Sequence, residues 1–350
     1  MTKKLTFLGI ETSCDETAAA VIRENDNGTA DILSNIVSSQ IDEHKKFGGV
    51  VPELAARAHL ENIEFIIDTA LSESKVSIEQ IDGVAATAGP GLIVCLTVGL
   101  NIGKSIAAFA QKPFIGVNHL EGHALSPGLV EKINFPYLLL LISGGHTQYL
   151  IVKDINEYEQ LGTTIDDALG EAFDKVANIL GLDFPGGSQL ELLAMKGDYK
   201  KVSLPKPLIN VKSLDMSFSG LKTAAFNCNN EIDKNNISRC DLAASFQKSV
   251  ADVLCKKISL AIDISNKEFS CYKNVVVSGG VAANNYLRKK IIENVKLKNK
   301  LVFFPPTDLC TDNGAMIAWA GYELYTAGVK SKLNIKAKPR WPLESIGERV

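Results

Sequence analysis

Two histidines four residues apart, His119 and His123, are the side chains whose type and spacing most directly suggest chemistry. On a helix these positions lie on one face, about 6 Å apart between Cβ atoms, so both imidazoles can bind one metal ion. Glu121 points to another face, which separates the pattern from the His-Glu-x-x-His helix of zinc peptidases. Two solvated or core histidines are the alternative, because the pair alone lacks a third ligand. The chain has only five histidines, which favours the metal site.

A second polar cluster follows the expected buried strand Leu5–Ile10, in the sequence Glu11-Thr12-Ser13-Cys14-Asp15-Glu16-Thr17. Residues Ala18–Ile22 have the pattern of a returning strand, so we expect the polar segment at the tip of a hairpin. Asp15 and Glu16 are consistent with ordinary turn residues. Adjacent carboxylates beside three hydroxyl groups also suit a site that binds a phosphate or its metal counter-ion. The residues by themselves leave both interpretations open.

Two glycine pairs follow strands in the second half of the chain. Ser143-Gly144-Gly145-His146 separates the expected strands Tyr137–Ile142 and Thr147–Val152, and Ser278-Gly279-Gly280-Val281 ends the expected strand Asn274–Val277. Paired glycines permit the close backbone approach that a phosphate-binding turn needs, although each turn alone is common punctuation. Together with the turn after Ile10, they suggest a duplicated fold with a nucleotide between its halves.

The elements that must position these residues alternate between strand and helix, which predicts an α/β fold. In the first half we expect helices at Val51–Glu73, at Val94–Ala110 and from His119 onward, and strands at Ile81–Ala88 and Phe114–Val117. In the second half we expect helices at Asp166–Leu180, Gln189–Met195, Ser219–Asn229 and Ser238–Ser265. One face of the last helix is apolar, which predicts a core helix, through Leu242, Phe246, Val250, Val253, Leu254, Ile258 and Ala261.

Length and composition set broad limits. A chain of 350 residues usually has two domains, and 46% hydrophobic with 22% charged residues is an ordinary globular composition. Wholly apolar runs such as Tyr137–Ile142 are too short to span a bilayer, and the start of the chain has no signal-peptide pattern. We therefore expect a cytoplasmic protein that does not bind membranes. Seven cysteines without a Cys-x-x-Cys argue against a zinc ribbon or a disulfide framework.

The charge balance bears on nucleic-acid binding. A formal net charge of -3 predicts no general affinity for nucleic acid, so such a partner would need a local basic face. Arg288–Lys300 contains six Lys and Arg, and Ala327–Arg340 is also basic. Both segments are candidates for phosphate contacts, although a basic tail is usually a solvated end.

Taken together, the motifs resemble one family, the bacterial tRNA N6-adenosine threonylcarbamoyltransferases (TsaD), once described as O-sialoglycoprotein endopeptidases. The resemblance extends from Leu5 to Leu343. The residues that carry it are Gly9-Ile10-Glu11-Thr12-Ser13-Cys14-Asp15-Glu16-Thr17, Asn118-His119-Leu120-Glu121-Gly122-His123, Ile142-Ser143-Gly144-Gly145-His146-Thr147, Asp166-Asp167-Ala168-Leu169-Gly170-Glu171-Ala172-Phe173-Asp174-Lys175, Gly279-Gly280-Val281-Ala282-Ala283-Asn284 and Pro339-Arg340-Trp341-Pro342-Leu343.

The resemblance implies an actin-like, two-domain α/β fold of the sugar-kinase and heat-shock ATPase type, with duplicated halves and a nucleotide cleft between them. Residues 1–118, completed by the C-terminal segment 313–350, would form one subdomain. Residues 119–312 would form the other.

The resemblance also implies the reaction. The threonylcarbamoyl group of threonylcarbamoyl-AMP is passed to N6 of the adenosine 3′ of the anticodon, in tRNAs that read codons beginning with A. One Fe²⁺ per subunit would be held by His119, His123 and Asp312, a donor set suited to a divalent first-row metal. The expected catalytic residues are His119 and His123 with Asp15 and Glu16.

Bound ATP or threonylcarbamoyl-AMP is the expected nucleotide. By the same matching it would contact Ile142, Ser143, Gly144, Gly145, His146, Asp174, Gly187, Glu191 and Asn284. This sequence departs from the family at Glu191, where Asp is usual, and at Ser188, where Pro is usual. The expected partners are tRNA, the inactive paralogue TsaB, the ATPase TsaE, and a TsaC-type synthase that supplies the adenylate.

Three other classes compete with this assignment. A metallopeptidase would use the histidine pair but would not explain the glycine turns. An inactive nucleotide-binding scaffold would not need His119, His123 and Asp312. A sugar or acetate kinase of the same fold would explain the turns but not the metal ligands.

Overall fold

The computed structural model describes residues 3–232, 237–268 and 272–346. Its first sheet has five strands in the order β3-β2-β1-β4-β5. The central strand β1 pairs antiparallel with β2 and parallel with β4. The bounds are β1 Thr6–Glu11, β2 Glu16–Glu24, β3 Ala30–Ser39, β4 Gly83–Gly89 and β5 Phe114–Asn118.

The second sheet repeats this plan. Its order is β10-β9-β6-β7-β8, and its central strand β6 pairs antiparallel with β7 and parallel with β9. The bounds are β6 Tyr137–Ile142, β7 Thr147–Asp154, β8 Glu157–Thr163, β9 Asn274–Ser278 and β10 Leu301–Phe303. The same strand plan in both sheets confirms the predicted α/β fold with duplicated halves.

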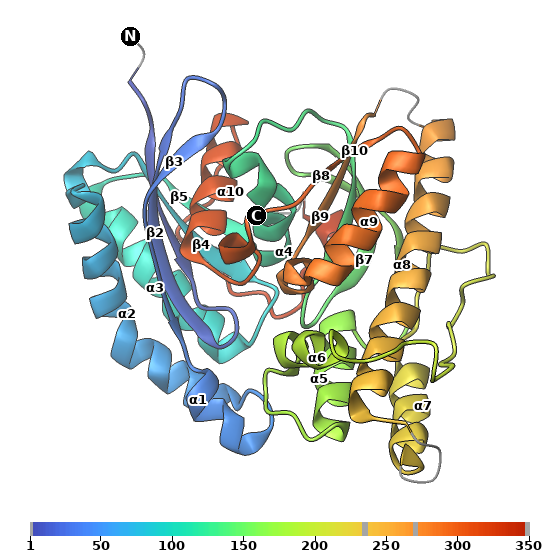
Figure 1. Cartoon of the computed structure of the whole chain (residues 1–350). Coiled ribbons are helices and arrows are strands. Elements are labelled where there is room, and N and C mark those ends of the chain that lie inside the picture. The colour runs from blue at the N-terminus through green and yellow to red at the C-terminus, as the bar shows by residue number, and fades with distance from the viewer. Residues whose placement is uncertain (1–2, 233–236, 269–271, 347–350) are drawn as a thin grey trace. The chain divides into compact units, whose positions relative to one another are not determined.

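Helices cover both faces of the first sheet. The helices of this half are α1 Ile41–His44, α2 Pro52–Ser74, α3 Ile93–Ala110, α4 His119–Leu125 and α10 Gly314–Thr326. Figure 1 shows α2 and α3 on one side of the sheet and α10 on the other. Glycines permit this packing, because a Cβ at Gly9 would collide with α10 and one at Gly103 would press on Ala86 of β4.

The second sheet carries a larger helical layer. Its helices are α5 Leu169–Ile179, α6 Gly186–Ala194, α7 Ser219–Asn229, α8 Arg239–Glu268 and α9 Asn285–Leu297. The long helix α8 packs against α6, α7 and α9. The structure confirms the predicted apolar face of α8, since all seven of its residues are fully buried. Short 3-10 turns are η1 Lys45–Phe47, η2 Ile78–Gln80, η3 Ser126–Leu129, η5 Gly280–Ala283, η6 Thr307–Leu309 and η7 Leu343–Ser345.

The chain divides into two compact units. Unit 1 contains residues 1–134, 153–158 and 311–350, and unit 2 contains residues 135–152 and 159–310. The family resemblance implied subdomain boundaries at 118/119 and 312/313, which would place α4 in the second subdomain. The observed division into two units instead places α4 in unit 1, because α4 packs on α10, β4 and β5.

Helix α3 is long and apolar enough to cross a membrane, by length and composition alone. In the structure its buried face contacts β1, β4, β5 and α2, as a core helix of unit 1 does. Six of the cysteines are free thiols, and Cys271 lies outside the described residues.

Candidate functional site

The first candidate centre is built at the start of α4. Asn118 ends β5, and its side-chain oxygen accepts hydrogen bonds from the backbone N–H groups of Leu120 (2.9 Å) and Glu121 (3.4 Å). This cap begins the helix at His119 and places His123 one turn later on the same face. The local sequence therefore fixes both imidazoles relative to β5.

A second capped helix supplies the carboxylate. Asn313 caps α10 by accepting from the N–H of Met316 at 2.9 Å, so Asp312 lies directly before the cap. Helices α4 and α10 pack closely because position 122 is glycine, where a Cβ would lie only 2.9 Å from Cδ1 of Ile317. The close packing brings Asp312 to the histidines although 189 residues separate it from His123.

The three side chains converge. Asp312 Oδ1 lies 3.0 Å from Nε2 of His123 and 3.5 Å from Nε2 of His119. One ligand atom from each residue lies within 4.8 Å of the others, a spacing that suits a metal ion. Nδ1 of His123 is buried and has no hydrogen-bond partner among the described residues. Two imidazole nitrogens and one carboxylate fit a divalent first-row metal.

Glu11 holds His119 from the other side of the ring. The Glu11 side chain is fully buried at the end of β1, and its Oε2 lies 3.1 Å from His119 Nδ1 and accepts a 2.6 Å hydrogen bond from Thr87. Ser13 Oγ lies 3.1 Å from the same Nδ1. A carboxylate at Nδ1 favours a proton there and leaves Nε2 as the ligand atom, as in metal sites with an orienting carboxylate.

Electrostatics agree with this arrangement. Burial acts to lower the pKa of His119, but the Asp312 and Glu11 carboxylates outweigh it and raise the pKa to about 9. Burial acts to raise the pKa of Glu11, yet the neighbouring His119 holds that pKa below its usual value. Without a metal the imidazole is therefore protonated, and a cation bound at Nε2 would replace that proton.

Asp15 ends the turn between β1 and β2, Glu16 begins β2, and both lie next to this centre. Burial, followed by the Asp312 and Asp15 charges, raises the pKa of Glu16 well above its usual value. Burial and the same two aspartates raise the pKa of the Cys14 thiol. Several acids crowded in a partly buried site favour a bound cation, which relieves their mutual repulsion.

A buried network supports this turn. His59 of α2 donates from Nε2 to the carbonyl of Cys14 at 3.0 Å, and its Nδ1 accepts from Thr17 Oγ1 at 2.8 Å and from Gln40 Nε2 at 3.2 Å. Gln40 Oε1 in turn accepts from His44 Nε2 at 3.1 Å. The neutral Nε2–H tautomer of His59 satisfies all three of these contacts.

The second candidate centre lies in unit 2, where β6 and β9 end side by side. Gly279 has φ +94°, and a Cβ there would lie 2.5 Å from the carbonyl oxygen of Ile142. The N–H of Gly170 in α5 donates to the Ser143 carbonyl at 3.1 Å. Adjacent carboxyl ends of parallel strands, followed by glycine turns, are the usual ligand edge of an α/β sheet.

Glycines leave this edge open. A Cβ at Gly144, Gly145, Gly187 or Gly280 would meet no atom within 4 Å. In the part of the chain that the structure describes, the N–H groups of Gly144 and Gly145 have no hydrogen-bond partner. His146 closes the turn, since its N–H donates to Ser143 Oγ at 3.1 Å. Two backbone N–H groups without a hydrogen-bond partner, in a turn of uncrowded glycines, suit an anion such as a phosphate.

The polar residues expected around this edge have structural partners as well. Asp174 Oδ1 accepts from the N–H of Gly186 at 2.8 Å, beside Gly187. Asn284 caps α9 and donates from Nδ2 to Gln247 at 3.1 Å. Glu191 Oε1 accepts from the N–H groups of Asn285 (2.8 Å) and Tyr286 (3.2 Å). The longer Glu191 side chain thus binds the backbone at the start of α9.

The expected site residues therefore form two groups, one in each unit. Unit 1 brings together His119, His123, Asp312, Asp15 and Glu16. Unit 2 brings together the turns at 142–146 and 279–280 with Asp174, Gly187, Glu191 and Asn284. The sequence did not indicate a role for Glu11, Thr87 or His59, although Glu11 belongs to the polar segment that follows the first strand.

Comparisons with known proteins agree with these features. A family model described as "TsaD: tRNA N6-adenosine threonylcarbamoyltransferase" matches residues 31–319. A curated relative of that name from Pelagibacter ubique (strain HTCC1062) is 54% identical over 346 residues, which cover 99% of this chain and 97% of that protein. One of the same name from Brucella canis (strain ATCC 23365 / NCTC 10854 / RM-666) is 52% identical over 341 residues, covering 96% and 95%.

Solved structures resemble the fold at low identity. The structure of full-length HypF in a phosphate- and nucleotide-bound form has a TM-score of 0.57 at 15% identity, covering 93% of this chain and 47% of that chain. The structure of HypF from T. kodakarensis has a TM-score of 0.59 at 17% identity, covering 93% and 48%. The chain thus spans about half of each HypF chain, and the likeness confirms the actin-like α/β fold.

Proposed function

Since this chain belongs to the TsaD family of tRNA N6-adenosine threonylcarbamoyltransferases, we propose that it performs the family's reaction with a metal ion held by His119, His123 and Asp312. It is a transferase, and its substrate is tRNA. The observation that carries the metal assignment is the convergence of two imidazoles and one carboxylate in unit 1.

The proposed reaction joins the threonylcarbamoyl group of threonylcarbamoyl-AMP to N6 of the adenosine 3′ of the anticodon, in tRNAs that read codons beginning with A. The N6 nitrogen attacks the carbamoyl carbon, and a C–N bond forms. The bond from that carbon to the phosphate oxygen breaks, AMP leaves with its electron pair, and N6 loses one proton. Because the adenylate is already activated, the protein needs no covalent nucleophile.

The metal that we propose is one Fe²⁺, and when bound it would supply Lewis acidity toward the carbamoyl oxygen. His119, His123 and Asp312 fit it in number and donor type. Glu11 keeps His119 in one tautomer. Asp15 and Glu16 add negative charge and are proposed to position the reacting group.

Unit 2 is proposed to bind the adenylate, or ATP, at the edge formed by β6 and β9. The open glycines of the 142–146 turn offer backbone N–H groups to the phosphate, which stabilise AMP as negative charge develops on it. Asp174, Gly187, Glu191 and Asn284 line the same edge and are proposed to hold the nucleoside. Binding in a fixed orientation lowers the entropic barrier to transfer.

Partners and a location are proposed with this reaction. We propose that the chain works with the inactive paralogue TsaB, the ATPase TsaE and a TsaC-type synthase. We propose that the reaction takes place in the cytoplasm. The peptidase alternative is disfavoured by Glu121, which is fully buried and accepts a 3.0 Å hydrogen bond from Tyr158.

Reconstitution tests the function. Labelled threonine, bicarbonate, ATP, the adenylate-forming enzyme, partner proteins and unmodified tRNA are combined with this chain, and digested tRNA is searched for threonylcarbamoyladenosine. Product should form only with this chain present and should be lost with His123→Ala. If tRNA stays unmodified while the protein cleaves a glycopeptide in a metal-dependent way, the peptidase alternative replaces the transferase.

A further inference from the structure

An irregular loop in unit 2 carries a concentration of positive charge. Between the end of α6 at Ala194 and the start of α7 at Ser219 the chain has no helix or strand. Residues 196–212 contain five lysines and one aspartate. Loops this long without secondary structure are uncommon in compact domains, and ordered ones usually have a function. We call residues 196–212 the basic loop.

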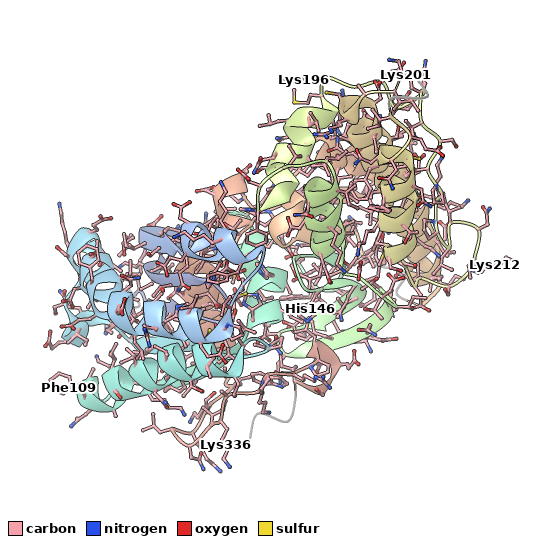
Figure 2. All side chains as sticks on the ribbon, turned by 90° about the horizontal axis from the view of Figure 1, so that it is seen from below. Phe109, His146, Lys196, Lys201, Lys212 and Lys336 are labelled. Atoms are coloured by element: carbon pink, nitrogen blue, oxygen red, sulfur yellow. The ribbon has the colours of Figure 1, made fainter. Side chains whose placement is uncertain are left out.

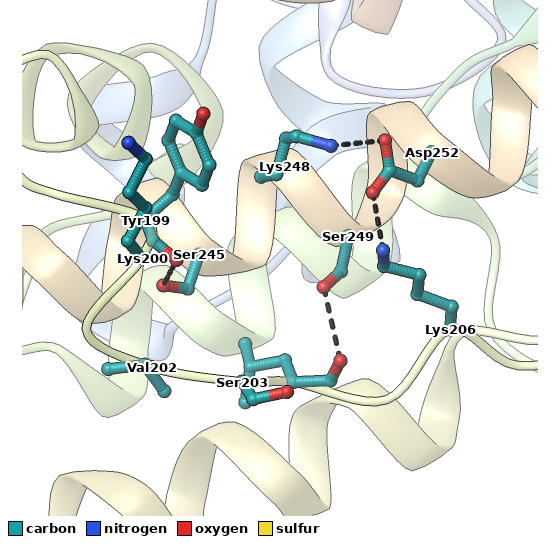
Figure 3. A pocket seen from close by; sticks show the side chains of 10 residues that line it. Tyr199, Lys200, Val202, Ser203, Lys206, Ser245, Lys248, Ser249 and Asp252 are labelled. Atoms are coloured by element: carbon teal, nitrogen blue, oxygen red, sulfur yellow. Dashed lines mark hydrogen bonds and ion pairs between the residues drawn. The ribbon is translucent and has the colours of Figure 1, made fainter.

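Helix α8 holds the first part of this loop in place. Asp241 is buried and accepts from the N–H of Asp198 at 2.8 Å and from Lys201 Nζ at 3.2 Å. One turn later, Ser245 donates to the carbonyl of Tyr199 at 3.1 Å (Figure 3). The N–H of Asp198 is the main reason why the pKa of Asp241 lies far below its usual value. Asp241 is thus ionised and anchors the loop.

The later residues of the basic loop contact the next turns of α8. Lys206 forms a 2.7 Å ion pair with Asp252, and Figure 3 shows Lys248 pointing at the same carboxylate. Lys257 has no exposed surface, and its Nζ donates to the carbonyls of Val211 (3.1 Å) and Ser213 (2.6 Å). The apolar face of α8 therefore packs in the core while its other side fixes the basic loop. A loop held in this way pays little ordering entropy when it binds a ligand.

Three of the five lysines are available for a ligand. Lys196, Lys200 and Lys212 are exposed and form no ion pair among the described residues. Figure 2 shows Lys196, Lys201 and Lys212 projecting outward from unit 2. Tyr199, next to Lys200 in the sequence, has 43% of its surface exposed, and it lines a hollow of about 320 Å³ with Lys200, Lys206 and Lys248. Lysines around an exposed aromatic ring are typical of surfaces that bind RNA backbone and stack on bases.

The basic segment Arg288–Lys300 is less available. Lys290 pairs with Glu293 at 2.8 Å and Lys298 with Asp263 at 2.8 Å. Lys300 donates to the Tyr272 carbonyl at 2.6 Å, and Arg288 donates to the Pro305 carbonyl at 2.6 Å. Four of its six cations thus have partners inside unit 2, so fewer of them are available for phosphate contacts than the sequence alone suggests.

We propose that the basic loop, with Lys248, binds the phosphodiester backbone of the tRNA substrate. The proposal rests on the proposed function, which makes tRNA the ligand that an acidic protein must attract. Exposed lysines act as point charges on flexible stems, which suits phosphates spaced along a strand. Phosphate contacts carry no sequence information, so the loop contributes affinity equally to every tRNA that it meets.

Two variants of equal charge test the proposal. Lys196→Gln, Lys200→Gln and Lys212→Gln together remove the three lysines without an ion pair. The control combines Lys46→Gln, Lys75→Gln and Lys267→Gln, which are exposed lysines elsewhere. Binding of the iron-loaded chain to unmodified tRNA is measured over a range of salt concentrations. The loop variant should bind on the order of 10- to 100-fold more weakly at low salt, and the slope of log K against log salt should fall by about 2.

Kinetics separate this proposal from the proposed function. In the reconstituted reaction the loop variant should raise KM for tRNA, while kcat, iron content and adenylate binding match the control. If both variants bind tRNA with the same affinity and slope while wild type transfers the group, the loop proposal is overturned and the function stands. If the loop variant loses affinity only for a purified partner protein, the loop docks protein, and the proposal is equally overturned. Absence of transfer by wild type would count against the function instead.

Discussion

His119 is the side chain on which the first centre depends, because it is held from both sides. Glu11 and Ser13 face Nδ1, and Asp312 faces Nε2. A histidine with a carboxylate at each nitrogen retains its ring orientation with or without a metal. The ligand set is therefore preorganised, which reduces the cost of binding.

Removing one ligand should remove the metal. In His119→Ala two ligands are left, and a mononuclear site with two ligands binds a divalent ion weakly. We expect iron content by elemental analysis to fall well below one per chain, with circular dichroism unchanged. Iron equal to wild type in this variant would contradict the ligand assignment.

Glu11→Gln should weaken metal binding without removing a ligand. The amide keeps the size of the side chain but loses the charge that fixes the His119 tautomer. Substituting a residue that hydrogen-bonds a metal ligand typically lowers metal affinity about 10- to 100-fold. Competition with a chelator should therefore show a loss of metal affinity in that range. Thr87→Val is the control, because it removes only a neighbour of Glu11. If Glu11→Gln matches wild type while His119→Ala does not, Glu11 has only a structural role.

His59 should make stability depend on pH. Burial is the main reason why its pKa lies below 6.5, so the folded chain holds the neutral form while the unfolded chain takes up a proton more readily. The stability that His59 contributes is complete above about pH 6.5 and is lost as the pH falls through the folded pKa. The difference in urea midpoint between wild type and His59→Gln should therefore shrink from pH 7.5 to pH 5. A constant difference would show that His59 does not titrate.

At the scale of elements, the sequence predicted those with a strong apolar signal. Strand β6 and helix α7 begin and end at the expected residues, α2 differs from its expected range by one residue at each end, and α3 differs by one residue at its start. Strand β3 was missed because most of its residues are at least partly exposed, so it lacks an apolar run. Helix α10 was missed because it is buried on nearly every side and has no polar face to reveal its period.

Site residues could be predicted when their partners are close in the sequence, and not when their partners are distant. The pair at His119 and His123 is local, and helical spacing alone indicates it. Glu11 could not be assigned, because its partner lies 108 residues away, and only the pairing of β1 with β4 and of β4 with β5, which precedes α4, brings them together. The sequence did not indicate the basic loop, because the loop is held by side chains on α8. These side chains lie outside the apolar face of that helix, at positions that periodicity predicts to be exposed to solvent.

The turn before α6 provides the prediction at this scale. Asp174 on α5 accepts from the N–H of Gly186, so it shapes the start of α6 beside the open Gly187. Asp174→Ala leaves that N–H without its acceptor, and we expect binding of a threonylcarbamoyl-AMP analogue to weaken about tenfold, with iron content unchanged. Asp174→Asn retains an acceptor oxygen and should bind within a few-fold of wild type. Wild-type affinity of the Ala variant by calorimetry would exclude Asp174 from the nucleotide site.

At the scale of the whole molecule, one strand plan serves two kinds of chemistry. Both sheets present the end of a central strand, β1 or β6, followed by a hairpin turn. In unit 1 this turn carries carboxylates beside two histidines, which suits a cation. In unit 2 it carries glycines whose N–H groups have no hydrogen-bond partner among the described residues, which suits an anion. Duplication fixes the backbone position, and the turn sequence determines which charge each site suits.

The net charge of the whole chain sets the last prediction. At -3 the protein has no long-range attraction for tRNA, so its affinity must come from local lysines and from partner proteins. We expect KM for tRNA to fall when the partners are added, while iron content and adenylate affinity of this chain stay constant. With partners present, the rate at low tRNA should decline as salt rises, because released counter-ions favour binding less, whereas the rate at saturating tRNA should change little. Equal KM values with and without partners would show that this chain alone supplies the tRNA surface.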